Sequence, residues 1–362
     1  MPVTDFDPPA AHLEPPPVPT PAPTLIQPAL YPTRRDAWSW ARPFTLDRWL
    51  ERQGFTPGWS ALLVLILAFF VYQLIGGIVA VVLVIVQASQ SGVPLEQDAL
   101  MEALTSDIKL LLMGNAVGQF LGFGLLVWLV TRLHTRQVGP FLRWRRPDMP
   151  GLGLAVVGWM ALYPGLIWLG SLNERLPQPQ WLEDLEQAQI DLLEGALLGS
   201  EISGFLLLLL VAVTPAICEE LLFRGYLQRQ VERSRGVVWS IVAVGLAFGL
   251  YHLRLTQLVP LSLLGMYLGY ITWTTGSIWS AMLIHLFNNG LAVQVAVYAR
   301  ESETLDLEAL ESMAMPWYYG VLSLLAAVGV LVLLKRRREA VVGAAPDALV
   351  LSPDPALPPT HE

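Results

Sequence analysis

The sequence is poor in charged residues, has one cysteine and shows no excess of basic side chains. Charged residues make up 14% of its 362 positions, whereas a soluble domain carries roughly 25%. The net charge of −8 argues against the basic surface that a nucleic-acid-binding protein needs. Cys218 has no intramolecular disulfide partner and is interpreted as a small buried apolar residue. No basic stretch followed by an apolar one marks a cleaved signal peptide.

Hydrophobic residues take the place of the missing charge. They make up 54% of the chain, and the mean hydropathy is +0.51. Several apolar stretches reach the ~20 residues that a helix needs to cross a hydrocarbon core of ~30 Å. The spans are predicted at 58–87, 108–131, 151–171, 203–222, 238–252, 258–275, 277–298 and 317–334. The sequence therefore predicts an all-α fold, a polytopic membrane helix bundle of about eight transmembrane helices.

Both ends of the chain differ in composition from this bundle. Residues 1–36 are rich in proline, which removes backbone donors and disfavours helix and sheet, so a disordered tail is expected there. Residues 339–362 are predicted to form a second disordered tail. The transmembrane helical domain is expected to occupy 37–338.

The loop charges predict an orientation. Of the 22 Lys and Arg residues, 18 lie before the first span or after the second, fourth and eighth spans. Positive residues near span ends are retained in the cytoplasm, so both termini are expected to be cytoplasmic. The opposite loops are acidic. An integral protein of the bacterial cytoplasmic (inner) membrane is the expected location.

Ionisable side chains inside the spans need an explanation, because each costs about 2.5–3.5 kcal/mol on insertion scales. Three clusters of polar residues lie within the predicted spans or at their ends. They are Glu219 and Glu220 with Arg224, then His252, and finally His285 with Asn288 and Asn289. Glu220 and Arg224 are four residues apart on a helix, which favours an ion pair, and Glu219 is turned about 100° away. His285 and Asn289 share one helix face.

These groups suggest catalysis, although structural roles are also open. A carboxylate, two imidazoles and an amide are sufficient to deprotonate water and to stabilise an oxyanion. Alternatively, Glu219, His252 and His285 form a catalytic metal site for zinc or another divalent metal. The Glu220–Arg224 pair is equally well a structural ion pair at a helix end, and His252 and Tyr251 read as interfacial residues. His285 lies about 12 Å inside its span, where a structural role is less expected.

The depths of two of these residues conflict in a simple model of the spans. If the fourth span ends at 222, Glu219 lies near the cytoplasmic side and His252 about 20 Å deeper. The stretch EELLFRGYLQRQVERS has no proline and one glycine, so the fourth helix is predicted to continue to about Arg233. That extension places Glu219 deeper in the bundle, at the level where it can meet His252.

Three motifs in this region resemble one family. EELLFR fits E-E-x-x-x-R, FGLYH fits F-x-x-x-H and HLFNN fits H-x-x-x-N, over residues 200–295. Their order and spacing resemble those of the CPBP family, which contains the type II CAAX prenyl endopeptidases and relatives linked to bacteriocin immunity. The resemblance implies an eight-helix intramembrane endopeptidase with a cavity open to the cytosol and the lipid.

The resemblance also implies roles for single residues. Glu219 corresponds to the general base that activates water, with His252 as its partner, and His285 and Asn289 to the oxyanion-stabilising pair. The supporting positions are Glu220, Arg224, Asn288 and Phe248. The motifs leave open whether hydrolysis uses a metal or a glutamate-activated water without one.

Two functions are therefore compared below. The first is an endopeptidase that cleaves membrane-associated or lipidated polypeptides in or at the lipid bilayer. The second is a non-catalytic membrane scaffold or transporter that uses the same polar residues to bind an ion or relay protons. The presence of every motif member favours the endopeptidase, and no inverted repeat is evident to favour a transporter.

Overall fold

The structure is a computed structural model that describes residues 24–26, 44–91, 107–198, 202–301 and 315–343. Of the two predicted tails, residues 1–23, 27–36 and 344–362 lie outside the described residues. A short antiparallel pair joins β1 (Thr24–Ile26) to β2 (Phe44–Leu46). Everything else that is described is helix or connection.

The prediction of a polytopic helical membrane bundle is confirmed. Seven helices in the described residues are long and apolar enough to cross a membrane. Four of them carry single labels: α2 (Pro57–Ser91), α7 (Met149–Asn173), α14 (Ile278–Glu301) and α16 (Trp317–Gly343). The fifth is α13 (Leu258–Thr275), preceded by the short 3₁₀ turn η6 (Leu255–Gln257).

The other two spans are longer helices interrupted by π-helical stretches. One consists of α4 (Ile108–Gln119), η3 (Phe120–Leu125) and α5 (Leu126–His134). The second consists of α9 (Gly204–Leu207), η4 (Leu208–Val213), α10 (Thr214–Glu220), η5 (Leu221–Leu227) and α11 (Gln228–Arg235). This confirms the prediction that the fourth helix continues past Arg224 to about Arg233.

The predicted fifth span is a helix that is too short to cross a bilayer straight. It is α12 (Val237–Tyr251), with 15 residues, or about 22 Å at 1.5 Å per residue. All eight predicted positions are thus helical, but seven of these helices are long enough to span. Gly236 makes the turn from α11 into α12 with φ of 85°, a value that only glycine adopts readily. Its last residue, Tyr251, packs against Phe69 of α2 and Phe223, so the short helix ends inside the bundle.

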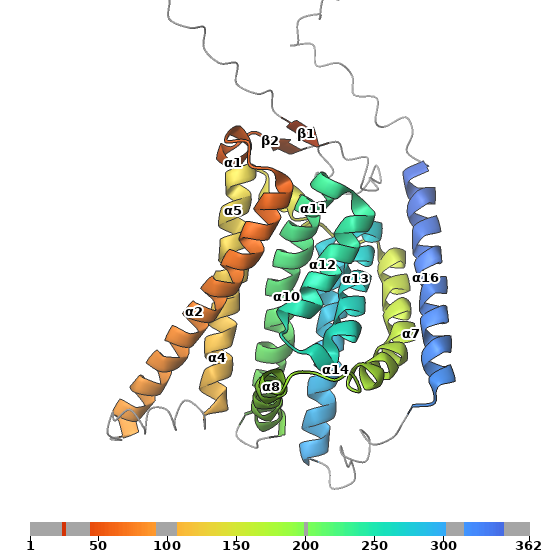
Figure 1. Ribbon diagram of the computed structural model, residues 1–362. Helices are drawn as coiled ribbons and strands as arrows, with labels where there is room; N and C mark the ends of the chain where they lie inside the picture. The colour runs from red at the N-terminus through yellow and green to blue at the C-terminus, as the bar shows by residue number, and fades with distance from the viewer. Residues whose placement is uncertain (1–23, 27–43, 92–106, 199–201, 302–314, 344–362) are drawn as a thin grey trace, which may run out of the picture.

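One helix lies where the sequence suggested an acidic loop. It is α8 (Gln180–Leu198), which lies at one end of the bundle beside α14 and α4 (Figure 1). Its Leu182 and Glu186 face the protein and are buried, whereas Trp181 and Glu183 are exposed. The short helices α1 (Trp49–Arg52) and α6 (Val138–Phe141) lie towards the opposite end.

Pairs of antiparallel helices build the bundle. The closest pairs are α2 with α4, α7 with α16 and α12 with α13, while α10 packs on α14 near the centre (Figure 1). Gly114, Gly118 and Gly122 let α4 and η3 approach α2. A Cβ atom at Gly118 would lie 2.6 Å from the carbonyl oxygen of Tyr72. Small residues spaced by four are typical of close helix contacts in membranes.

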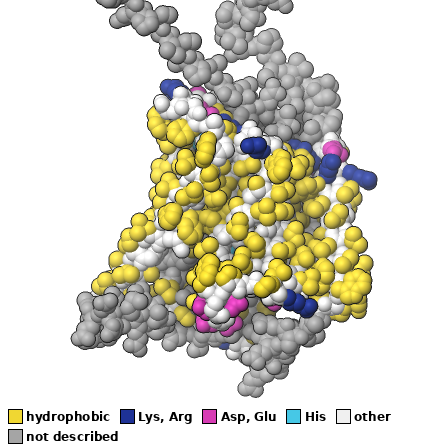
Figure 2. Space-filling model, viewed as in Figure 1, with side chains coloured by type: hydrophobic (Ala, Val, Ile, Leu, Met, Phe, Trp, Pro, Cys, Tyr) yellow, Lys and Arg dark blue, Asp and Glu magenta, His cyan; other side chains and the backbone are white. Residues whose placement is uncertain are grey.

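The surface agrees with a lipid environment. Figure 2 shows a broad hydrophobic band across the visible face, with charged side chains near its two ends. Large apolar side chains such as Phe70, Phe205 and Leu325 are more than half exposed. Because lipid tails are as apolar as these side chains, such exposure is favourable only in a bilayer. The protein is an integral membrane protein.

Candidate active site

Two neighbouring carboxylates at the end of α10 have different surroundings. Glu220 is fully buried, and Arg224 Nη1 donates to its Oε1 at 2.8 Å. Arg224 is also fully buried, and its Nη2 donates to the Gly265 carbonyl at 3.0 Å. The side chain of Glu219 is half-buried instead, and its Oε2 has no hydrogen-bond partner among the described residues. The 100° step between adjacent helical residues separates these two environments.

Glu220 also binds the second histidine. The Nδ1 atom of His285, on α14, lies 2.8 Å from Glu220 Oε1. Because an ionised carboxylate only accepts, Nδ1 carries the proton. The Nε2 atom of His285 lies 3.3 Å from Asn289 Nδ2 and accepts from that amide. Glu220 is therefore shared between Arg224 and His285, and its negative charge is balanced by Arg224.

Asn289 and Asn288 extend this network. Asn289 Nδ2 also donates to the Val211 carbonyl on η4 at 3.2 Å. Asn288 Nδ2 donates to Asn289 Oδ1 at 3.3 Å, and Asn288 Oδ1 accepts from Trp159 Nε1 at 3.3 Å. The distances lie near the long limit for N–H···O bonds. The amide pair is therefore held in place by weak hydrogen bonds.

His252 ends α12 and has a defined tautomer. Its Nδ1 lies 2.8 Å from the Phe248 carbonyl, which only accepts, so Nδ1 carries the proton and Nε2 has a free lone pair. The Phe248 ring packs against His252 at 4.8 Å and against His285 at 5.8 Å between ring centroids. The guanidinium of Arg224 lies 4.5 Å from the centre of the same ring. Phe248 thus fixes the relative positions of all three motifs.

Side chains of α8 and of the end of α7 hold the loop after His252 in place. Leu253 has a positive φ of 52°, which ends the helix. Glu186 on α8 is 2% exposed, and its Oε1 accepts from the Thr256 amide at 3.1 Å. Asn173, at the end of α7, binds the Leu255 carbonyl and the Val259 amide, each at 2.8 Å. Burial lowers the pKa of Arg254 in this loop, and the Glu186 and Glu174 charges partly oppose that shift.

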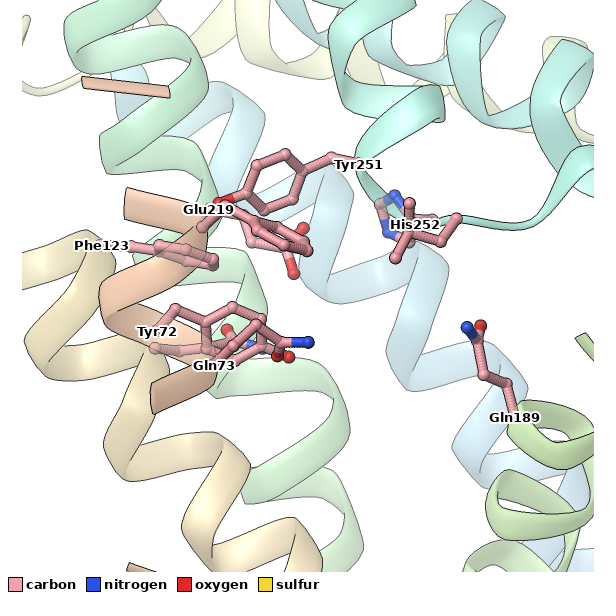
Figure 3. Close-up of a pocket in the computed structure, with 10 residues that line it drawn as sticks. Tyr72, Gln73, Phe123, Gln189, Glu219, Tyr251 and His252 are labelled. Atoms are coloured by element: carbon pink, nitrogen blue, oxygen red, sulfur yellow. The ribbon is translucent and has the colours of Figure 1, made fainter. Parts of the chain in front are cut away.

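A cavity of about 390 Å³ joins Glu219 and His252 (Figure 3). Its walls come from six elements. They are Phe69, Tyr72 and Gln73 on α2; Gln119 on α4 and Phe123 on η3; Glu219 on α10; Tyr251, His252 and Leu253 at the end of α12; and Gln189 on α8. His285 and Asn289 do not line this cavity and lie in the buried network behind it. The structure thus brings the Glu219–His252 pair to one cavity and the predicted oxyanion pair to an adjacent layer.

Several of these lining residues were not identified from the sequence. Tyr251 was interpreted as an interfacial aromatic, but its ring packs edge-on against Phe69 and Phe223, and its hydroxyl is buried. Gln73 and Gln119 are polar residues in otherwise apolar spans, but neutral amides are well tolerated in membrane helix bundles and did not indicate a site. Gln189 lies on α8, which was not predicted.

The candidate metal ligands are not arranged as a metal site. In the ranges that the structure describes, no three His, Cys, Asp or Glu side chains are grouped to hold an ion. Both ring nitrogens of His285 are engaged, one by Glu220 and one by Asn289. Glu219, His252 and His285 in these positions do not fit a metal ion, so no reaction step is assigned to one.

The comparison with protein families agrees with the motifs. Residues 201–291 match the family described as Type II CAAX prenyl endopeptidase Rce1-like, which confirms the resemblance to the CPBP family. The match over this region implies a membrane endopeptidase acting on a polypeptide, with a possible metal dependence. No curated protein and no solved structure matches the chain.

Proposed function

We propose that the protein hydrolyses peptide bonds within the bilayer and that Glu219 and His252 activate the attacking water. One observation carries the proposal: a carboxylate oxygen and a histidine Nε2 that have no partner among the described residues belong to side chains that line the same cavity. Figure 3 shows that they reach it from different helices. A buried carboxylate left without a partner is unfavourable by about 1–3 kcal/mol or more. A bound water donating to it would offset that penalty.

The reaction balances with these two groups. The water oxygen attacks the carbonyl carbon of the scissile bond while Glu219 Oε2 takes one water proton. His252 Nε2 accepts a hydrogen bond from the other water hydrogen, which stays on the attacking oxygen, and so orients that oxygen. As the tetrahedral intermediate collapses, the C–N bond breaks and the proton on Glu219 passes to the leaving amine. The low dielectric of the bundle strengthens each charge interaction.

We also propose that Asn289 and a protonated His285 stabilise the oxyanion, which requires the scissile carbonyl to reach past the cavity wall to their buried network. Asn289 Nδ2 binds the Val211 carbonyl and His285 Nε2 at 3.2 and 3.3 Å, so both bonds are long. A developing oxyanion is a stronger acceptor than either partner, and it would compete for the Asn289 amide. Glu220 stabilises any positive charge that forms on His285. A catalytic hydrogen bond that shortens only in the substrate complex is common in enzymes.

The substrate class and the location follow from the surroundings of the site. The substrate is a membrane-associated or lipidated polypeptide, because the site lies about midway along the 32-residue helix Gly204–Arg235. The location is the bacterial cytoplasmic membrane, with both termini cytoplasmic. The orientation is supported by Arg48 and Arg52 at α1 and by the basic run 335–338 in α16, which lie at the same end of the bundle (Figure 1).

The test is cleavage of lipidated and unlipidated membrane peptides by the purified protein in lipid nanodiscs. Glu219→Gln and His252→Ala should each lower the rate by on the order of 10²–10⁴-fold. Glu183→Gln, an exposed carboxylate on α8, is the matched control and should cleave normally. Equal rates for Glu219→Gln and wild type would overturn the assignment.

Two further arms of the experiment separate the alternatives. A chelator added to the wild type distinguishes metal-dependent from metal-free hydrolysis. Absence of any cleavage by the wild type, in a panel that spans both substrate types, would favour the non-catalytic scaffold or transporter.

A further inference from the structure

Three glutamine amides line the cavity beside Glu219. Gln119 comes from α4, Gln73 from α2 and Gln189 from α8. The amides of Gln73 and Gln189 are drawn pointing into the space between the helices in Figure 3. The proposed chemistry uses none of them. Three amides that line one cavity from separate elements need a function of their own.

Gln119 provides the strongest evidence. Its side chain is 6% exposed, and its Oε1 has no hydrogen-bond partner among the described residues. Leaving a buried amide oxygen without a donor is unfavourable by about 1–3 kcal/mol. The residue lies at the junction of α4 with the π-helical stretch η3, and such stretches are frequent at functional sites. A ligand that donates to this oxygen would offset the unfavourable term.

The wall that carries the amides is rigid. Gly118 lies one residue before Gln119, and a Cβ atom there would come within 2.6 Å of the Tyr72 carbonyl oxygen. The backbones of α2 and α4 are therefore in direct contact, which fixes the backbone positions of Gln73 and Gln119 relative to each other. A binding group that is held before the ligand arrives loses little entropy on binding.

A substrate in the bilayer supplies the matching groups. A transmembrane segment must leave its helical conformation before a peptide bond can reach Glu219, and this frees backbone N–H and C=O groups. In hydrocarbon each free group is unfavourable by several kcal/mol. A glutamine amide accepts from an N–H and donates to a C=O, so it suits an unwound main chain irrespective of its side chains.

We infer that Gln119, with Gln73 and Gln189, forms a subsite that binds the main chain of an extended substrate segment. Gln119 Oε1 accepts a backbone N–H, and the other two amides bind neighbouring peptide groups. The inference rests on the proposed function for its substrate, but the binding it describes is independent of cleavage. It predicts recognition of the backbone rather than of particular side chains.

The experiment measures binding without cleavage. Protein carrying Glu219→Gln in nanodiscs is titrated with a fluorescent single-span peptide of Leu and Ala with a central Gly-Ser segment. Ester analogues replace one backbone N–H at a time by oxygen. We expect one central ester to weaken binding about tenfold, which corresponds to about 1.4 kcal/mol. The double variant Glu219→Gln/Gln119→Leu should bind the amide peptide about tenfold more weakly than the Glu219→Gln protein does. In this double variant the same ester should cause no further loss of affinity.

Controls keep the result interpretable. Gln187→Leu changes an exposed residue of α8 and should bind like the parent, whereas Gln189→Leu should bind more weakly. Gln119→Met serves as a second variant if Gln119→Leu lowers the thermal midpoint. Equal loss from the ester with and without Gln119 would overturn the subsite, as would failure of the Glu219→Gln protein to bind the amide peptide.

The two proposals fail differently. Coupling between Gln119 and the ester, in a wild type that cleaves nothing, would support the subsite and refute the peptidase. Cleavage that depends on Glu219, without such coupling, would support the peptidase and refute the subsite.

Discussion

Replacing Gly122, on η3, by alanine should push α2 and η3 apart and damage the cavity that both line. The added Cβ atom would lie 2.6 Å from the Tyr72 amide nitrogen and 2.7 Å from its Cα. Both neighbours are backbone atoms and cannot rotate away. Because ordinary contacts need 3.4 Å or more, the helices must separate locally by about 1 Å. Overpacking of this kind typically destabilises a protein by about 1–3 kcal/mol.

The same displacement should lower activity. Tyr72 and Phe123, on the two sides of this contact, line the cavity beside Glu219 (Figure 3). A misplacement of about 1 Å in a catalytic site is associated with losses of about 10²-fold. We expect the cleavage rate of Gly122→Ala to fall by 10-fold to 100-fold, and its thermal midpoint in detergent to fall as well.

Gly124 provides a matched control on the same helical stretch. A Cβ atom at Gly124 meets nothing within 4 Å, so Gly124→Ala gives the intrinsic gain of about 1 kcal/mol for alanine in a helix without the clash. Circular dichroism melts and cleavage rates of both variants decide the matter. If Gly122→Ala is as stable and as active as Gly124→Ala, the close approach of α2 and η3 described here is wrong.

Two further predictions concern groups outside the cavity. Glu186→Ala removes the acceptor of the Thr256 amide, so the loop after His252 should loosen and cleavage should slow about tenfold. The exposed control Glu183→Ala should cleave normally. Equal cleavage rates for the two variants would exclude this positioning role. Burial alone would raise the pKa of Glu51, but hydrogen bonds and charges from His134 and Arg233 hold this pKa below its usual range. The ionised Glu51 therefore stabilises the protein above about pH 4.3, and this stabilisation is lost as the pH falls through the lowered pKa. Wild type should therefore lose thermal stability on acidification more steeply than Glu51→Gln, and parallel melting curves against pH would contradict this.

Hydropathy located the helices because a chain in lipid can adopt few backbone conformations. Every backbone group in the hydrocarbon core must be paired, so an apolar stretch of sufficient length forms a helix. The same reasoning failed for α8, whose acidic and apolar residues alternate in a connection that looked like a loop. Hydropathy also could not show that α12 stops within the bundle, since its sequence is as apolar as that of the longer spans.

The motif residues and the cavity residues were predictable to different degrees. Glu219 and His285 stand out in sequence because ionisable groups are rare in membrane helices. Gln73 and Gln119 do not, because neutral amides are tolerated there and their proximity depends on how α2 packs against α4. Close approach of two helices is encoded in glycine spacing, but the sequence does not state which face meets which partner.

The adjacent pair Glu219 and Glu220 explains why the motif needs two carboxylates in sequence. A single buried carboxylate would have to compensate Arg224 and also remain available to a water, and these demands conflict. On one helix turn, Glu220 satisfies Arg224 and His285, which leaves Glu219 free to face the cavity. The π-helical stretches η4 and η5 on either side of α10 change the direction of side chains along this helix. A small rotation that exchanged the two carboxylates would break the bond from Glu220 to His285 on α14 and the bond from Arg224 to Gly265 on α13, which is why Glu219 is the proposed base.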